Sequence, residues 1–137
     1  MIHVVGGTYV ELCRESSWSE LFGSGLRASL ALAALPEQVR FSTFVGPKER
    51  PVLEAKAIGF ETIFTEAAET VRFSYLHPLS MPVIEPETYV RSCEIKPQTI
   101  QIKGRKILRF GMIEGSAKVE GEMVIGVGGC IVAGRAR

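Results

Sequence analysis

Apolar and polar residues in the first half of the chain follow the pattern of alternating strands and helices. Short apolar runs that stop at glycine, such as Ile2 to Val5 before Gly6-Gly7, predict buried strands. An alanine- and leucine-rich segment follows Ser24 and ends before Pro36, as expected for a helix. The order strand-helix-strand-helix-strand favours a mainly parallel sheet with flanking helices. The predicted strands cover residues 2–5, 39–45 and 60–65, and the predicted helices cover 26–35 and the segment from Pro51 to Gly59.

The second half of the chain has a different pattern. Residues 71–75 alternate with period two, which predicts a half-exposed strand, and three prolines then mark an irregular stretch. Two β-type runs on either side of Gly104 predict a hairpin over residues 99–110. We therefore expect a small β-rich excursion at about 71–110.

The last part of the chain completes the expected domain. Residues 116–120 fit a single helical turn, and residues 122–127 predict a final strand that returns to the main sheet. A chain of 137 residues has the ordinary size of one domain and can bury enough surface for a core. We therefore expect a single α/β domain over residues 1–137, a Rossmann-like half in which the parallel sheet carries the excursion.

Composition narrows the functional classes. The chain has no aspartate and no asparagine, so all fifteen acidic residues are glutamate. An Asp-based triad, a phosphotransfer aspartate or an Asp/Asn metal cage cannot be built from these residues alone. The net charge of +1 gives no reason to expect nucleic acid or an anionic membrane surface as a partner. No apolar run approaches the roughly 20 residues of a membrane helix.

Cysteine and histidine add little chemistry. Cys13, Cys93 and Cys130 are odd in number and match no zinc spacing, so we expect free thiols in a reducing cytoplasm and no metal site. His3 lies inside an apolar run and is expected to pack in the core, whereas His77 begins a loop.

Three features could contact a ligand. Gly23-Ser24-Gly25 opens a predicted helix, where free N–H groups and the helix dipole attract anions or hydroxyl oxygens; a plain helix cap of small residues is the alternative. Glu11 follows the first strand, at the sheet edge where α/β proteins bind ligands, unless it is a solvated surface residue. Arg27 lies in the first helical turn, where the dipole disfavours a cation. It would either grip an anionic or polyol ligand or remain an exposed arginine.

The same glycines also fit a dinucleotide-binding fingerprint. With Ala28 the stretch spells G-x-G-x-x-A, which should follow directly from a strand and precede an acid by about twenty residues. Residues 18–22 make a poor strand by pattern. A strand in front of Gly23 is the observation that would favour this alternative.

Taken in order, the motifs resemble the N-terminal part of the ribokinase-like carbohydrate kinases of the PfkB type. The resemblance covers nearly all of this chain but less than half of a typical family member. It rests on Val5-Gly6-Gly7 followed by Glu11, on Gly23-Ser24-Gly25-Leu26-Arg27-Ala28 at a helix start, and on Phe44-Val45-Gly46 at a strand end.

The resemblance implies a set of substrate-binding residues and no catalytic one. Glu11 stands where the family has a sugar-binding aspartate, and Arg27 where an asparagine often contacts the sugar. These departures, with Pro47 after Gly46, suggest a ligand more anionic than a simple sugar. The implied substrate-binding residues are Glu11, Gly23, Gly25 and Arg27, with Phe73 and Tyr75 in the region of the substrate lid.

The resemblance also implies an incomplete kinase. In the family, the Gly-Ala-Gly-Asp anion hole with its catalytic aspartate and most of the ATP site lie in the C-terminal half. We expect this chain to retain the substrate-binding half and to be inactive alone, whether by truncation, by a frame change or as one half of a split protein. ATP and Mg²⁺ are implied for a complete family member, and no cofactor is expected on this chain alone.

The expected partners follow from the same resemblance. The ligand would be a sugar, a polyol or a nucleoside. The apolar strand around Met123-Val124-Ile125 has no proline or lysine to protect its edge, which predicts a homodimer or a complex with a complementary C-terminal half. The alternative function is a non-enzymatic ligand-binding or assembly module on the same α/β scaffold.

Overall fold

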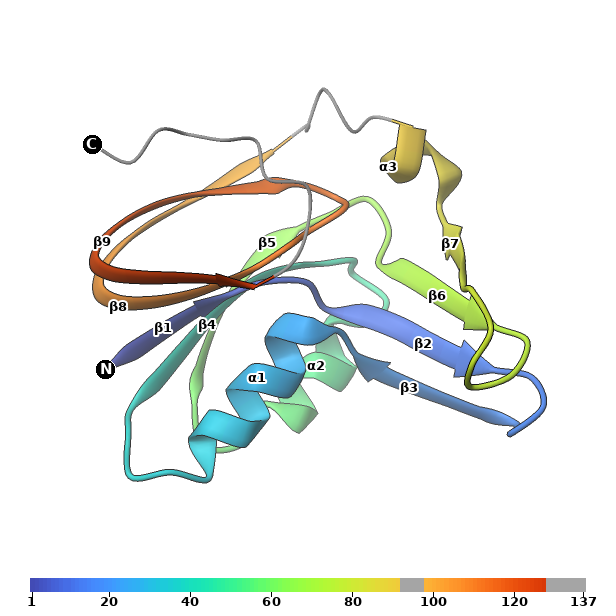
Figure 1. Ribbon diagram of the computed structural model, residues 1–137, viewed down its shortest axis with the longest axis horizontal. Coiled ribbons are helices and arrows are strands. Elements are labelled where there is room, and N and C mark those ends of the chain that lie inside the picture. Colours follow the sequence, from blue (N-terminus) through green and yellow to red (C-terminus); the bar gives the residue numbers. More distant parts are fainter. Residues whose placement is uncertain (92–97, 128–137) are drawn as a thin grey trace.

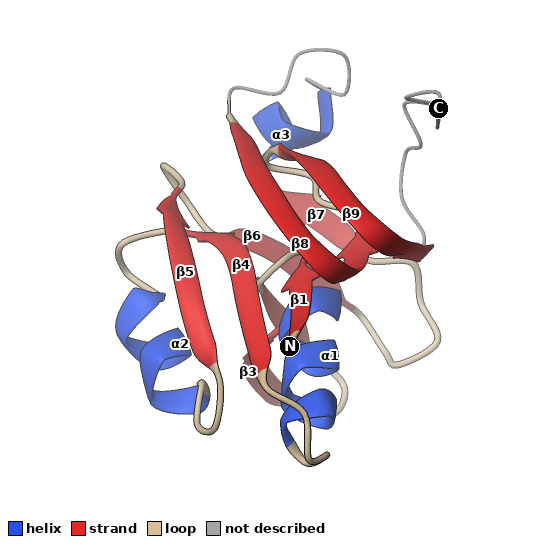
Figure 2. Cartoon of the chain, turned by 90° about the vertical axis from the view of Figure 1, so that its left-hand side faces the viewer, coloured by secondary structure: helices blue, strands red, loops and turns tan. Residues whose placement is uncertain are grey.

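The protein contains two separate β-sheets. The computed structural model describes residues 1–91 and 98–127. The main sheet has five parallel strands in the order β5-β4-β1-β8-β9, and β1 lies in its centre (Figures 1 and 2). Val4 of β1 is opposite Phe41 of β4 on one side and Leu108 of β8 on the other. The strands are β1 (Ile2–Val5), β4 (Val39–Val45), β5 (Glu61–Glu66), β8 (Thr99–Phe110) and β9 (Ser116–Val127).

Two helices cover one face of the main sheet. The strands β1, β4 and β5 follow one another in a single direction across the sheet, so right-handed crossovers place α1 (Ser24–Ala33) and α2 (Arg50–Lys56) on the same side (Figure 2). Leu26 of α1 and Leu53 of α2 are fully buried against Val4 and Phe41. The predicted α/β fold with a mainly parallel sheet is therefore confirmed. No helix in the described ranges is long and apolar enough to cross a membrane.

The strands β8 and β9 curl over the other face of the sheet. They are parallel, each has twelve residues, and five residues, 111–115, connect them. An extended strand of that length spans about 40 Å, whereas such a link reaches only about 20 Å. The strands must therefore bend back, and Figure 1 shows them as a wide arc. Their inner side packs Ile100 and Ile102 against Val5 and Phe44.

The structure corrects two predictions in this region. The hairpin predicted around Gly104 is wrong, because residues 99–110 form one continuous strand. Gly104 is directly opposite Gly121 of β9, and a Cβ atom at Gly121 would approach the Gly104 oxygen to 2.7 Å, so the glycines permit a bend where the sequence suggested a turn. The helical turn predicted for residues 116–120 is also wrong. This segment pairs with β8, with Ala117 buried and Lys118 exposed, which is strand alternation.

The second sheet lies beyond the end of β1, to the right in Figure 1. Its strand order is β3-β2-β6-β7, in which β2 runs antiparallel to β3 and parallel to β6, and β6 runs antiparallel to β7. A short helix, α3 (Glu87–Arg91), follows it. The strands are β2 (Tyr9–Cys13), β3 (Trp18–Phe22), β6 (Val71–Tyr75) and β7 (Val83–Glu85).

This sheet differs in extent from the predicted excursion. Residues 18–22, a poor strand by pattern, form β3, and β2 was not predicted at all. The sheet combines β2 and β3 with β6 and β7, whereas β8 belongs to the main sheet. Each residue of β3 pairs with one of β2, so hydrogen bonding to a neighbour stabilises a strand that its own alternation predicts poorly.

Candidate ligand-binding site

Glu11 is the centre of a polar cluster between β2 and the start of α1. Its Oε1 atom accepts a hydrogen bond of 3.2 Å from the backbone N–H of Gly23, and its Oε2 atom forms an ion pair with Nη2 of Arg27. The Glu11 side chain is 15% exposed and that of Arg27 is 53% exposed. A carboxylate in this position is stabilised by the positive end of the helix dipole.

The two glycines of the helix start have different roles. Gly23 has a φ of +88° and caps α1, and a Cβ atom there would lie 2.4 Å from the carbonyl oxygen of Gly7. Gly25 packs behind the cluster, against Gly6, and its N–H donates to the Gly7 oxygen at 3.2 Å. Both N–H groups are thus used within the protein, one by Glu11 and one by the turn after β1.

A second ion pair lies beside the first. The guanidinium of Arg27 lies 4.1 Å from the ring centre of Phe22, and the ammonium of Lys56 lies at the same distance. Lys56, on α2, is paired with Glu20 on β3. The aromatic ring therefore has two cations near it, and each cation has its own carboxylate. The sequence singled out neither Phe22 nor Lys56, because only the folded chain brings them together.

Phe73 and Tyr75 lie on the same sheet face as Glu11. In the parallel pair of β2 and β6, Phe73 is opposite Glu11 and Tyr75 is opposite Cys13, and residues paired in this way project to the same side. The Phe73 ring lies 4.9 Å from that of Tyr9. Burial and then the Glu11 carboxylate raise the pKa of the Tyr75 hydroxyl, while Arg27 opposes this, so the hydroxyl stays protonated at neutral pH.

The structure therefore groups five of the six predicted site residues. Glu11, Gly23 and Arg27 are in contact, Phe73 and Tyr75 share the Glu11 face, and Gly25 is buried behind them. The arrangement offers a carboxylate acceptor, guanidinium donors and aromatic surface at one place, which suits a molecule with several hydroxyl groups.

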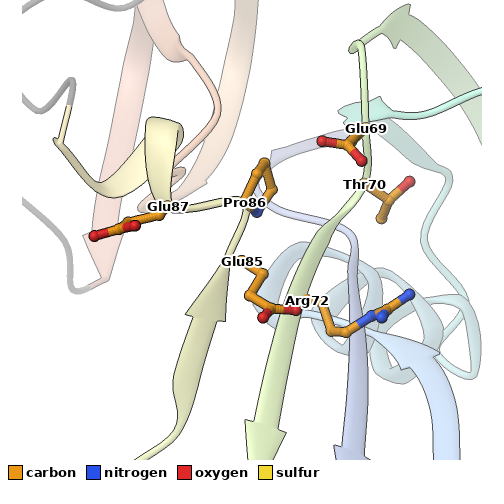
Figure 3. A pocket seen from close by; sticks show the side chains of 6 residues that line it. All are labelled: Glu69, Thr70, Arg72, Glu85, Pro86 and Glu87. Atoms are coloured by element: carbon orange, nitrogen blue, oxygen red, sulfur yellow. The ribbon is translucent and has the colours of Figure 1, made fainter.

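A hollow lies on another part of the described structure. Its volume is about 330 Å³, and Figure 3 shows its lining side chains. Arg72 and Glu85 are opposite each other on β6 and β7, and Arg72 alternates with Phe73, so the hollow is on the other face of the second sheet. We favour the Glu11 cluster because it combines paired donors and acceptors with aromatic rings, whereas acidic side chains predominate in the hollow. Its lining residues are Glu69, Thr70, Arg72, Glu85, Pro86 and Glu87.

Glu114, which follows the carboxyl end of β8, is a polar residue that the sequence patterns did not identify. It is buried just after β8, and its Oε2 atom accepts a hydrogen bond of 3.0 Å from the N–H of Ile113. Burial and then the Glu114 carboxylate raise the pKa of Tyr9, whose hydroxyl donates to the Gly111 oxygen at 3.4 Å. A glutamate just beyond the end of a strand is the signal that selected Glu11, and it would have identified Glu114 too.

The other candidate residues that the structure describes, His3 and Cys13, are buried. His3 is buried as predicted, and its Nε2 atom lies 2.8 Å from the Ser42 hydroxyl. Cys13 is a buried free thiol, and Cys93 and Cys130 lie outside the described residues. Within residues 1–91 and 98–127, no group of three or more His, Cys or Glu side chains could hold a metal ion.

The geometry disfavours the dinucleotide alternative. A strand does precede Gly23, but it is β3, which runs antiparallel to β2 in the second sheet. The fingerprint requires a strand of the parallel sheet that leads directly into the helix, with N–H groups available to a pyrophosphate. Here the N–H groups of Gly23 and Gly25 already have partners.

Several solved structures are similar to this chain, although no protein-family model and no curated protein sequence matches it. A pyrophosphate-dependent kinase of the ribokinase family, complexed with a pyrophosphate analogue and myo-inositol, aligns with a TM-score of 0.50 and 14% identity over 80% of this chain and 48% of its own. A pyrophosphate-dependent myo-inositol kinase altered by mutation aligns with a TM-score of 0.51 and 14% identity over 81% of this chain and 40% of its own. A microbiome-derived acarbose kinase aligns with a TM-score of 0.51 and 14% identity over 80% of this chain and 52% of its own.

These similarities concern the fold. The chain spans about half the length of the solved structures, or less. The mainly parallel sheet with flanking helices agrees with the resemblance read from the sequence, and a separate mixed sheet lies beside it. The protein has the ribokinase-like α/β fold, which it shares with kinases of the ribokinase family.

Proposed function

We propose that this chain is the substrate-binding part of a carbohydrate kinase of the ribokinase type. The ligand, a sugar, a polyol or a nucleoside, would lie between Glu11 and the first turn of α1. The observation that carries the proposal is the contact of Glu11 with both Gly23 and Arg27 on the face that holds Phe73 and Tyr75. The similar structures, a myo-inositol kinase and an acarbose kinase, support this substrate class.

Each side chain has a defined role in the proposed complex. Each oxygen of the Glu11 carboxylate has two lone pairs, so it can accept a hydrogen bond from a ligand hydroxyl in addition to its present bond. Arg27 has five N–H donors, of which the ion pair uses the Nη2 side, and the remaining donors can reach hydroxyl oxygens. The rings of Phe73 and Tyr75 would cover the apolar side of the ligand.

We expect the groups that carry out phosphoryl transfer to lie outside the described residues. Transfer of this kind depends on charge stabilisation around the phosphoryl group. The N–H groups of Gly23 and Gly25 already donate to Glu11 and Gly7, which disfavours a donor phosphate at the start of α1. ATP and Mg²⁺ would therefore be held by a complementary C-terminal half, and pyrophosphate is a further donor to test. We expect no release of ADP from ATP, or of phosphate from pyrophosphate, by this chain alone with any sugar.

A second candidate function, an assembly module, rests on the edge strand β9. Residues 120–126 are all exposed, and this run includes Met123, Val124 and Ile125, whose side chains alternate between the two faces. Between residues 119 and 126 the strand has no proline or lysine. The charged residues of this run, Glu120 and Glu122, are paired with Lys103 and Arg105 of β8. The apolar part of the edge is a template for strand pairing, so the chain would associate with a second copy or with the complementary half.

Titration of the folded chain with neutral polyols tests the main proposal. We expect calorimetry or ligand-observed NMR with myo-inositol, glucose, ribose and adenosine to detect binding near millimolar, or about −4 kcal/mol. Glu11→Gln and Arg27→Ala should weaken it about tenfold, as expected for lost hydrogen bonds to charged groups. Glu54→Gln is the matched control, because Glu54 forms its ion pair with Arg50 and not with Arg27. Binding that neither site variant changes would contradict the assignment.

A further inference from the structure

The charges of the candidate site are balanced in pairs. Arg27 is bound to Glu11, and Lys56 is bound to Glu20. Both cations also lie 4.1 Å from the ring centre of Phe22, which holds them in this arrangement. Together these two ion pairs contain two positive and two negative side chains and have no net charge.

The start of α1 offers little additional attraction to an anion. A helix N-terminus normally binds anions through its dipole and its free N–H groups. In this protein the Glu11 carboxylate already lies there, with Oε1 on the N–H of Gly23, and the N–H of Gly25 donates to Gly7. Glu11 is thus the anion of this helix terminus, and it belongs to the protein.

We infer that the site selects a neutral polyhydroxylated ligand over its phosphorylated form, and that Glu11 sets this selectivity by neutralising Arg27. The inference rests on the proposed function and names the charge of its substrate. A phosphate group near the pair would be attracted by Arg27 and repelled by Glu11 at similar distances, so the two effects largely cancel. The charged phosphate would still lose part of its hydration on binding, with no net attraction to offset that cost. A hydroxyl group, in contrast, can use both partners, as a donor to Glu11 and as an acceptor from Arg27.

This inference reverses the expectation from the sequence alone. An arginine at a position where asparagine often contacts the sugar suggested a more anionic ligand. In the structure, the same arginine is paired with the one carboxylate that the chain provides at the sugar-binding position. Glu11 keeps the negative charge of the family's aspartate, and Arg27, in place of an asparagine, adds a positive charge that this carboxylate neutralises.

Paired titrations test the charge selectivity. The probes are glucose with glucose 6-phosphate and ribose with ribose 5-phosphate, titrated into the wild type, Glu11→Gln and Arg27→Gln. We expect the wild type to bind each neutral sugar at least about tenfold more tightly than its phosphate. Glu11→Gln unmasks Arg27 and should shift this ratio about tenfold toward the phosphate, whereas Arg27→Gln should shift it further toward the neutral sugar.

The matched control is Glu54→Gln on α2. It removes a carboxylate from an arginine that also lies over a phenylalanine ring, with Arg50 at 4.8 Å from the centre of Phe64. This variant should leave the selectivity ratio unchanged. Arg27→Gln provides the test if Glu11→Gln does not fold, since a thermal melt identifies folded variants before titration.

The outcomes separate the inference from the function on which it rests. If the wild type binds sugars but prefers the phosphates, or if Glu11→Gln and Glu54→Gln give the same ratio, the charge inference is wrong and the binding function stands. If the wild type binds neither form, the proposed function is wrong, and the inference falls with it.

Discussion

Glu11 and Arg27 join the second sheet to the first helix of the main sheet. Their ion pair connects β2 to α1 across sixteen positions of sequence, and the N–H of Gly23 adds a second connection to the same carboxylate. One carboxylate with two partners thus adds to the contacts between the second sheet and α1, which also include the shared core of Leu21 and Leu26. Loss of Glu11 breaks both connections, whereas loss of Arg27 breaks one.

The two residues should consequently differ in their effect on stability. We expect Arg27→Ala to cost about 1 kcal/mol or less, because its half-exposed ion pair is screened by solvent. Glu11→Ala should cost more, about 1–2 kcal/mol, because it also leaves the Gly23 N–H without its acceptor. Urea denaturation of both variants measures the difference, and a larger cost for Arg27→Ala would contradict this order.

Gly23 should not tolerate a side chain. Its φ of +88° lies in a region that other residues rarely adopt, and a Cβ atom would meet the Gly7 oxygen at 2.4 Å. We expect Gly23→Ala to lower the free energy of unfolding by about 3 kcal/mol or more. Gly126→Ala is the control, because its Cβ atom would meet nothing within 4 Å. Equal thermal melting of the two variants would show that the tight cap is not required.

Stability should fall in mild acid because of His3. Burial, and then the charge of Arg40, lower the pKa of His3 from its ordinary value of 6.5, while Glu61 opposes the shift. The unfolded chain then binds the proton more readily, so stability is complete above about pH 6.5 and declines as the pH falls toward the lowered pKa. His3→Gln should flatten the dependence of the denaturation midpoint between about pH 7.5 and 5.5. If the His3→Gln variant keeps the wild-type pH dependence, His3 is not the cause of the lower stability in acid. His77→Gln is the control.

The exposed β9 edge should mediate association. Ile125 is 53% exposed in the apolar part of the edge strand, so we expect the chain to dimerise or associate further at micromolar concentrations in sedimentation experiments. Ile125→Lys should shift it toward monomer, because a charge on the edge disfavours strand pairing. Leu79→Lys is the control for exposed apolar surface away from β9, since Leu79 is 92% exposed in the loop after β6. A wild type that stays monomeric at high micromolar concentration would contradict the assembly proposal.

Local patterns predicted the parts of the fold that local chemistry determines. The apolar run at Ile2–Val5 and the alanine-rich segment of α1 were recognisable because burial and helix propensity act on neighbouring residues. Gly104 was misread, because a glycine permits a bend within a strand as readily as a turn between strands. The strand β3 depends on its pairing with β2, which the sequence does not state.

The sequence predicted several residues that the structure brings together, but not how their charges are paired. Glu11 was selected by its position after a strand, and the structure places it against the predicted helix start. The contacts of Arg27 with Glu11 and with the Phe22 ring are long-range side-chain geometry, so the sequence could not show that the cation was already neutralised. Glu114 was overlooked because the segment before it was assigned to a hairpin.

The most direct test of the account is to locate a bound polyol by NMR. In a titration of the labelled chain with myo-inositol or glucose, we expect the side-chain N–H signal of Arg27 and the amide signal of Gly23 to shift, while those of Arg50 and Gly126 remain unchanged. Shifts confined to the hollow around Thr70 and Arg72, or no shift at all, would contradict the proposal that ligands bind between Glu11 and α1.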